Sequence, residues 1–172
     1  YAVGTFDGKS FTPAHEGKHR VHYGAYYASQ TFSDPPDGRR IQIGWARIPM
    51  PDMPFNQAFT LPHRLTLRTT PEGVRMFAEP IEELAKLRQR HHRAGPETLS
   101  AASPVSVDVT GELFEVCATF EVGQAQSLGL DIGGNRVTYD TESQKLNGAD
   151  LRPVDGRVTV QVFVDRPMIE IC

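Results

Sequence analysis

The sequence predicts an all-β protein that contains one small sheet followed by most of a β-sandwich. Three observations lead to this prediction. Short segments alternate apolar and polar residues, Gly, Pro, Asn and Asp separate them, and only one stretch has the composition of a helix. With 172 residues, the chain is long enough for one large or two small domains with a buried core.

The first half of the chain predicts a series of β-hairpins. Residues 1–12 begin as "YAVGTF", turn at Asp-Gly and continue as "KSFT". Residues 26–32 and 39–45 flank a loop rich in Pro, Asp and Gly, and residues 58–70 and 74–80 flank a "PEG" turn. We therefore expect the last four segments to form one meandering antiparallel sheet.

One stretch, residues 81–95, has helix-forming composition and apolar residues three positions apart. It is short and charged, so we expect a connector of one to three turns. The polar tail that follows, "RHHRAGPETLSAASP", is typical of a boundary between domains. The predicted domains are residues 1–90 and 91–172.

The second half returns to a β pattern, with strands about ten residues apart and Gly, Asn or Asp turns between them. In a single final strand, the odd separation of Asp165 and Glu170 would place them on opposite faces. The sandwich is expected to lack its last strands, since the pattern stops at Cys172. The expected strands are residues 105–111, 113–122, 127–133, 136–143, 144–151 and 157–172.

Composition excludes several classes of function. A formal charge of -3 and a pI near 6.1 leave no excess of positive charge for nucleic acid or an anionic membrane surface. No apolar run approaches the roughly 20 residues of a membrane-spanning helix. Cys117 and Cys172 would form a disulfide only if the fold brought them together, and no Cys/His spacing indicates a metal site. We expect a neutral ligand and no cofactor.

Carboxylate pairs are the groups to seek in an enzyme that cleaves a neutral glycoside. Asp34 and Asp37 lie in the Pro-rich loop, and Glu82 and Glu83 lie on the predicted helix, which favours solvated turn and helix charges over catalytic acids. No nucleophile elbow, P-loop or dinucleotide-binding motif is present. The sequence by itself therefore predicts no catalytic residue.

Histidines and aromatic residues give two further candidate sites. His15, His19 and His22 cluster in sequence, but spacings of four and three in a Gly-containing loop do not fix a metal geometry. Tyr26, Tyr27, Trp45 and Phe55 are expected at strand ends or beside loops. There a planar ring can either stack on the apolar face of a sugar or pack in a core between sheets.

Six motifs occur in the order seen in glycoside hydrolase family 32, the β-fructofuranosidases that include invertases, levanases and inulinases. Together they span essentially the whole chain, which therefore resembles members of this family. The motifs are "YAVGTFDGKSFTP", "YGAYYASQTFSD", "GRRIQIGW", "LPHRLTLR", "FAEPIEELAKLR" and "VFVDRPMIEI".

This resemblance implies a five-bladed β-propeller with a central active-site funnel, followed by a C-terminal β-sandwich. In the family, the nucleophile lies in a Trp-Met-Asn-Asp-Pro-Asn-Gly motif, a stabilising Asp in Arg-Asp-Pro, and the acid/base Glu in Glu-Cys-Pro. None of these motifs occurs here. We therefore expect the last propeller blade and the sandwich, cut from a larger enzyme at both ends, and no retaining double displacement by these residues alone.

Two positions resemble residues that line the sugar pocket in the family. Tyr27 matches the Tyr of Asp-Phe-Tyr-Ala, and Trp45 matches the Trp of Gly-Trp. Phe55 stands near the position of a family Trp-Arg-Gly segment and is a third candidate substrate-binding residue. Residues 22–28, "HYGAYYA", lack two acidic residues that are common at these positions in the family. We therefore expect the pocket, and with it the substrate, to differ from the family pattern.

The resemblance leaves three hypotheses open. The chain is the C-terminal portion of a hydrolase that acts on sucrose, inulin or levan type fructosides, a non-catalytic carbohydrate-binding or assembly module, or a catalytically degenerate sugar-binding propeller. The expected partners are a fructoside and either the rest of a propeller or a second copy of the chain, since a lone blade exposes edges and an apolar face. The sequence does not indicate a cellular location, but the resemblance implies a secreted or periplasmic protein.

Overall fold

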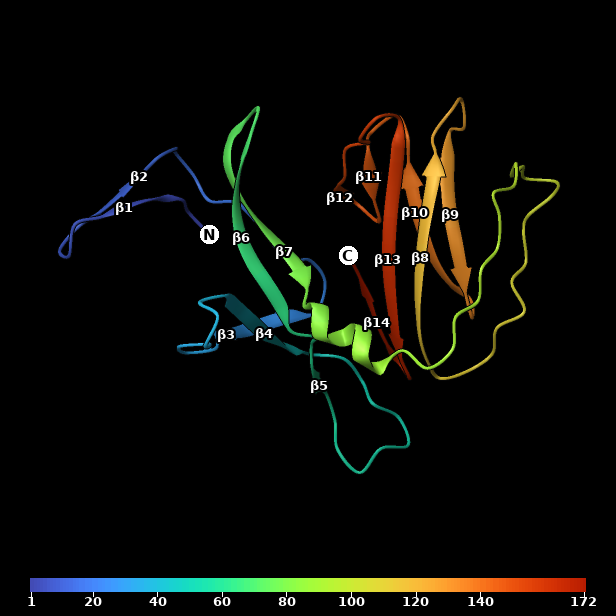
Figure 1. The fold of residues 1–172 in the computed structure, drawn as a ribbon, viewed down its shortest axis with the longest axis horizontal. Coiled ribbons are helices and arrows are strands. Elements are labelled where there is room, and N and C mark those ends of the chain that lie inside the picture. The colour runs from blue at the N-terminus through green and yellow to red at the C-terminus, as the bar shows by residue number, and fades with distance from the viewer. The chain divides into compact units, whose positions relative to one another are not determined.

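The computed structural model describes residues 1–172 and confirms that the protein is all-β, with a single short 3₁₀ helix (Figure 1). The chain divides into two compact units, Tyr1–Phe114 and Glu115–Cys172. Residues 88–112 contain no helix or ladder strand, only a bridge between Ser100 and Ser103. The predicted domain boundary after residue 90 lies near the start of this segment, and the division between the two units follows its end.

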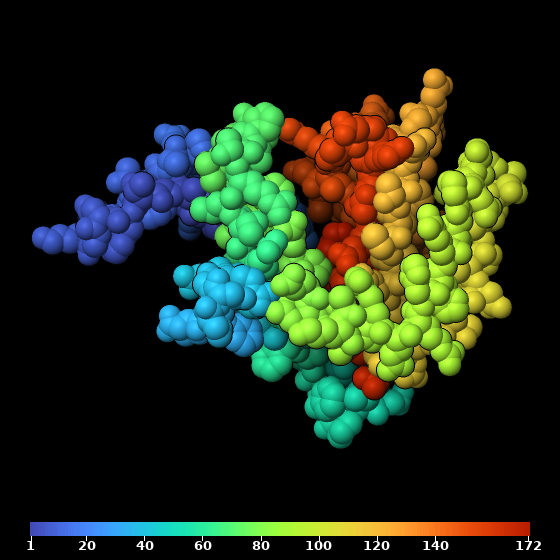
Figure 2. Space-filling view, in the orientation of Figure 1, coloured from blue at the N-terminus to red at the C-terminus, as the bar shows by residue number.

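The first unit begins with the predicted hairpin, β1 (Gly4–Phe6) and β2 (Phe11–Pro13). The Asp7 carboxylate accepts hydrogen bonds from the backbone N–H groups of Lys9 and Ser10, at 2.8 and 2.7 Å, which closes the turn. Every residue of the two strands is exposed, and the hairpin extends away from the rest of its unit (Figure 2).

The main sheet of the first unit is the predicted meander, with strand order β3-β4-β6-β7 and the short strand β5 beside β4. The expected strand 58–70 is divided in two at Leu61-Pro62, because a proline nitrogen has no hydrogen to donate to a ladder. The strands are β3 (Tyr26–Thr31), β4 (Arg40–Ala46), β5 (Ala58–Phe59), β6 (His63–Thr70) and β7 (Gly73–Pro80).

The predicted helical connector is the 3₁₀ helix η1 (Glu82–Leu87). Apolar residues three positions apart suit a 3₁₀ helix, which has three residues per turn. None of its residues is buried, and Glu83 ties it to the start of β4 through Arg39.

The second unit holds a four-stranded sheet, β12-β11-β10-β9, and a three-stranded sheet, β14-β13-β8, whose strand β8 begins two residues before this unit. The bounds are β8 (Leu113–Glu121), β9 (Ser127–Ile132), β10 (Asn135–Asp140), β11 (Lys145–Leu146), β12 (Ala149–Asp150), β13 (Arg157–Asp165) and β14 (Met168–Ile171). Both sheets contribute to one buried apolar cluster, made of Val137, Tyr139, Leu146, Val158, Val160 and Val162.

Three predictions for this half of the chain are wrong. The expected strand 144–151 is a hairpin in which β11 pairs antiparallel with β12, because Asn147 and Gly148 adopt the positive φ values of a tight turn. The expected strand 105–111 is absent, because its alternating residues have no neighbouring strand to pair with, and Val107 and Val109 are exposed. The expected final strand 157–172 is a hairpin that turns at Arg166-Pro167.

The turn changes the relation of two carboxylates. Asp165 pairs with Met168 and Phe163 pairs with Glu170, so Asp165 and Glu170 share one face of the hairpin instead of lying on opposite faces. Cys117 and Cys172 form no disulfide. Desolvation, with the nearby Glu170 carboxylate, raises the pKa of the Cys172 thiol to about 12. No helix in the structure combines the length and hydropathy needed to cross a membrane.

Candidate functional site

Three aromatic side chains form a row across strands β3, β4 and β5. Tyr27 pairs with Trp45 and Trp45 pairs with Phe59, and directly opposed residues point to the same face of a sheet. The Tyr27 and Trp45 ring centroids are 6.0 Å apart with a 57° angle between planes. The exposed fractions are 54% for Tyr27, 41% for Trp45 and 73% for Phe59, so all three rings are accessible. We call Tyr27, Trp45 and Phe59 the aromatic row.

Arg47 lies at one end of this row. It follows Trp45 by two residues, which places it on the same face, and its guanidinium carbon lies 4.6 Å from the centroid of the Tyr27 ring. A backbone hydrogen bond of 3.0 Å from Arg47 N–H to the Ala25 carbonyl continues the ladder to this position. The row therefore combines apolar ring faces with a cationic hydrogen-bond donor.

A β-bulge in β3 separates the aromatic row from the loop end of the hairpin. The register shifts by one between Tyr27 and Gln30, so Ala28 and Ser29 lie opposite Gly44. Ala28 has φ +43°, a conformation that is uncommon for a residue with a Cβ. The bulge sits next to the row, as bulges near binding sites often do.

The opposite face of the same strands is buried and fixes their position. The Tyr26 ring covers Gly44, where an added Cβ would lie 2.5 Å from the ring. The Tyr26 hydroxyl donates to Gln42 Oε1 at 3.2 Å, and His22 stacks on the Tyr26 ring at 3.7 Å. Gly44 N–H donates to Thr60 Oγ1 at 2.9 Å. These contacts hold the strands that carry the aromatic row.

Two histidines on this buried face are neutral at pH 7. Burial, together with the nearby His63, lowers the pKa of His22 to about 4. Burial also lowers the pKa of His63, whose Nδ1–H donates to the Leu61 carbonyl at 2.8 Å. Of the histidines considered as metal ligands, His22 stacks on Tyr26, His19 contacts Tyr1, and His15 lies against Gly73. No group of three His, Cys, Asp or Glu side chains could hold a metal ion.

The structure brings two of the three predicted sugar-binding residues together. Tyr27 and Trp45 are cross-strand neighbours, whereas no ring contact joins Phe55, which lies in the loop between β4 and β5, to either of them. Phe55 is exposed, and its role stays a prediction. Phe59 and Arg47 were not among the predicted residues. The alternation Trp45, Arg47 along one strand was a usable signal for Arg47, but Phe59 depends on pairing across a long loop.

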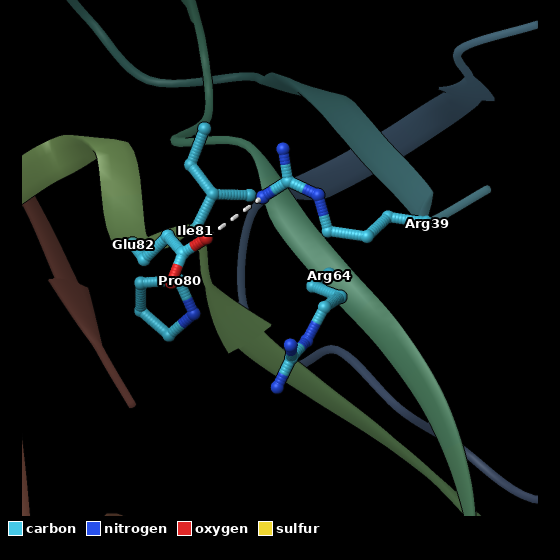
Figure 3. Close-up of a pocket in the computed structure, with 5 residues that line it drawn as sticks. All are labelled: Arg39, Arg64, Pro80, Ile81 and Glu82. Carbon is cyan, nitrogen blue, oxygen red and sulfur yellow. Dashed lines mark ion pairs between the residues drawn. The ribbon is translucent and has the colours of Figure 1, made fainter. Parts of the chain in front are cut away.

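Of the four carboxylates considered as catalytic acids in the Pro-rich loop and the helix, three gather around Arg39 instead of forming a pair: Asp37, Glu82 and Glu83. Arg39 donates two hydrogen bonds to Glu83, at 3.1 and 2.6 Å, and it also binds Asp37. Glu82 lies 3.8 Å from the Arg39 guanidinium, beside a small pocket that Arg64, Pro80 and Ile81 also line (Figure 3).

These contacts keep the Glu83 and Asp37 carboxylates ionised. The Arg39 hydrogen bonds lower the pKa of Glu83 to about 2, and the backbone N–H of Arg39 contributes most to lowering that of Asp37. A group that is ionised at every pH near neutrality is no general acid there. The Arg39 cluster therefore fastens η1 and the β3–β4 loop to the sheet.

Comparison with known proteins identifies the family. Residues 1–80 match the Glycosyl hydrolases family 32 N-terminal domain. A levanase of Bacillus subtilis (strain 168) is 30% identical over 209 residues, which cover 99% of this chain and 31% of that protein. A cell wall β-fructofuranosidase of Zea mays is 31% identical over 88% of this chain and 28% of that protein. These matches support glycoside hydrolase family 32 as the family of this chain.

A solved structure shows the same fold. The exo-inulinase of Aspergillus awamori matches 99% of this chain and 41% of its own chain with a TM-score of 0.74, at 20% sequence identity. The chain spans less than a third of the length of the two curated relatives named above. The resemblance inferred from the six sequence motifs is thereby confirmed at the level of the family.

Proposed function

We propose that this chain supplies one wall of a fructoside-binding site in a hydrolase of family 32. The observation that supports the proposal is the aromatic row, because exposed rings held by a rigid sheet can stack on the apolar C–H faces of a sugar. The named relatives, a levanase and a β-fructofuranosidase, support a fructan or sucrose type of substrate.

We further propose that the four-stranded meander of the first unit is the last blade of a five-bladed propeller, and that the two sheets of the second unit form the C-terminal sandwich. A four-stranded antiparallel meander is the topology of a propeller blade. The single apolar cluster shared by the two sheets of the second unit supports a sandwich.

In this proposal the chain binds and orients the sugar, and other carboxylates cleave it. A retaining glycosidase needs two carboxyl groups about 5 Å apart. The three acidic motifs of the family are missing from these residues, and the Asp37 and Glu83 carboxylates are bound to Arg39. Ring stacking would hold the fructoside in a fixed orientation. The carboxyl groups of the three family motifs, which are not among these residues, would then act on the oriented bond.

Sugar binding tests this proposal. We expect inulin and levan oligosaccharides to bind the protein in isothermal titration calorimetry, and Trp45→Ala to weaken binding about tenfold or more through loss of the ring face. Tyr27→Ala and Phe55→Ala test the other predicted positions. Phe6→Ala removes an exposed ring from the β1–β2 hairpin, outside the aromatic row, and should leave sugar binding unchanged. Undiminished binding by the Trp45 variant would refute the proposed site.

A second candidate function is assembly through the first unit. Its exposed apolar side chains include Phe6 and Phe11, which oppose each other on the β1–β2 hairpin, and such exposed pairs favour association with another protein surface or a second copy. Light scattering over a wide concentration range checks this. A monodisperse monomer throughout would exclude self-association.

A further inference from the structure

Two arginines of this sheet lie over aromatic rings, and they differ in whether a carboxylate pairs with their charge. Arg68 lies over the Phe77 ring at 4.6 Å, the same distance as Arg47 from Tyr27, but Arg68 also forms an ion pair with Glu79. Arg47 is exposed and forms no ion pair in the structure. Its guanidinium donors therefore face solvent while the Tyr27 ring limits its motion.

The position of this guanidinium suits a ligand that also contacts Trp45. Tyr27 touches both groups, with its ring 6.0 Å from that of Trp45 and 4.6 Å from the guanidinium carbon of Arg47. One monosaccharide stacked on Trp45 with a short substituent would reach Arg47. A guanidinium presents a planar fork of N–H donors that matches two oxygens of a tetrahedral anion, and the cation–π contact holds it in place before binding.

We propose that Arg47 is a specificity-determining residue that makes the aromatic row select saccharides carrying an anionic oxygen group, phosphate or sulfate. The inference rests on the proposed function, because it takes the aromatic row as a sugar-binding wall. The selectivity is local, since the protein as a whole carries a formal charge of -3 and does not attract anions over long distances.

The test compares three sugars by isothermal titration calorimetry at one fixed salt concentration. Fructose, fructose 6-phosphate and fructose 6-sulfate are titrated into the protein and into the variants Arg47→Ala, Arg47→Lys, Trp45→Ala and Arg68→Ala. Inorganic phosphate is titrated in the same way as the ligand without a sugar. We expect a charged sugar to bind about tenfold or more tightly than fructose, as hydrogen bonds to charged groups allow. The phosphate and sulfate arms show which anion is preferred.

The variants locate the selectivity. Arg47→Ala should abolish the advantage of the charged sugars, so that fructose 6-phosphate and fructose 6-sulfate bind no more tightly than fructose does to the same variant. Arg47→Lys should keep part of the advantage, because the charge remains and the fork is lost. Arg68→Ala removes an equally stacked arginine and should have no effect. Trp45→Ala should weaken all three sugars.

Several outcomes overturn the inference. If fructose binds and the charged sugars bind no better, the inference fails and the proposed function stands. If none of the sugars binds, both fail. If inorganic phosphate alone binds as tightly as fructose 6-phosphate and Trp45→Ala has no effect on either, the site recognises an ion and no saccharide, which also refutes the inference.

Discussion

The two units of this protein bury their apolar residues in opposite ways. Among the buried apolar side chains, Ala46 is the only member from the first unit, and the others belong to the second. Among the large exposed apolar side chains, Val154 and Ile171 are the only members from the second unit. The second unit therefore has its own core, whereas the first presents its rings to solvent.

This difference predicts that the second unit provides stability and that the first unit provides surfaces for binding. A unit with one continuous apolar cluster gains stability from close packing, and single substitutions there are costly. A sheet that keeps tyrosine, tryptophan and phenylalanine exposed has them available for a ligand or partner. We expect substitutions in the second unit to affect folding and those on the aromatic row to affect binding.

The largest expected effect is the loss of a buried ring from the second unit. Tyr139 is 1% exposed and lies in the apolar cluster, so Tyr139→Ala should lower the free energy of unfolding by about 3–5 kcal/mol. The matched variant Tyr23→Ala, at 49% exposure in the first unit, should cost less than about 1 kcal/mol. Urea unfolding followed by circular dichroism measures both, and similar losses would contradict the contrast between units.

A smaller effect is expected from crowding the buried face of the first unit. Gly44→Ala would place a Cβ 2.5 Å from the Tyr26 ring, which His22 holds from its other side, so we expect a loss of about 1–3 kcal/mol. Trp45 is the only tryptophan, so its fluorescence reports unfolding of this unit. In a double-mutant cycle, Tyr26→Ala should relieve part of the cost, and strict additivity would argue against the clash.

The first unit should also lose stability in acid. The pKa of His22 is about 4 in the folded protein and near 6.5 when unfolded, so the unfolded state binds more protons between these values. Stability is full above about pH 6.5 and declines as the pH falls to 4, by about 1–2 kcal/mol because the ring is partly solvated. His22→Phe should flatten this dependence in Trp45 fluorescence. The exposed His91→Phe serves as the control and should retain it.

The smallest expected effect concerns a single atom. The Tyr139 hydroxyl is buried without a hydrogen-bond partner, so removing it in Tyr139→Phe should leave the free energy of unfolding unchanged or raise it by less than about 1 kcal/mol. Thermal and urea unfolding check the result. A clear loss of stability would show that the hydroxyl contributes to the fold.

Local sequence signals predicted most of the strands, because turn residues and alternation act over a few positions. The hairpins β1–β2, β3–β4 and β6–β7 were expected for this reason. The turn at Arg166-Pro167 was not predicted. Arg166 adopts φ +53°, and a turn with this conformation is usually recognised in a sequence by Gly or Asn. The strand wrongly predicted at 105–111 shows why alternation alone is not sufficient. A strand also needs a neighbouring strand to pair with, and the local pattern does not reveal whether there is one.

The candidate site was predictable only in part. Tyr27 and Trp45 were identified through family motifs, and the register of β3 against β4 brings them together. Phe59 joins them through the pairing of β5 with β4, which spans a long loop and leaves no short-range pattern. The unpaired charge of Arg47 depends on which carboxylates fold close to it, and that information is not local to the sequence.

The bulge at Ala28 and Ser29 has a consequence for how this protein can vary. The register of Tyr27 with Trp45 lies on one side of the bulge, and the Pro-rich loop 33–38 lies on the other. A bulge already accommodates an extra residue in one strand, so an insertion or deletion near the loop can be absorbed there. The loop is then free to change in length across related proteins while the aromatic row keeps its alignment.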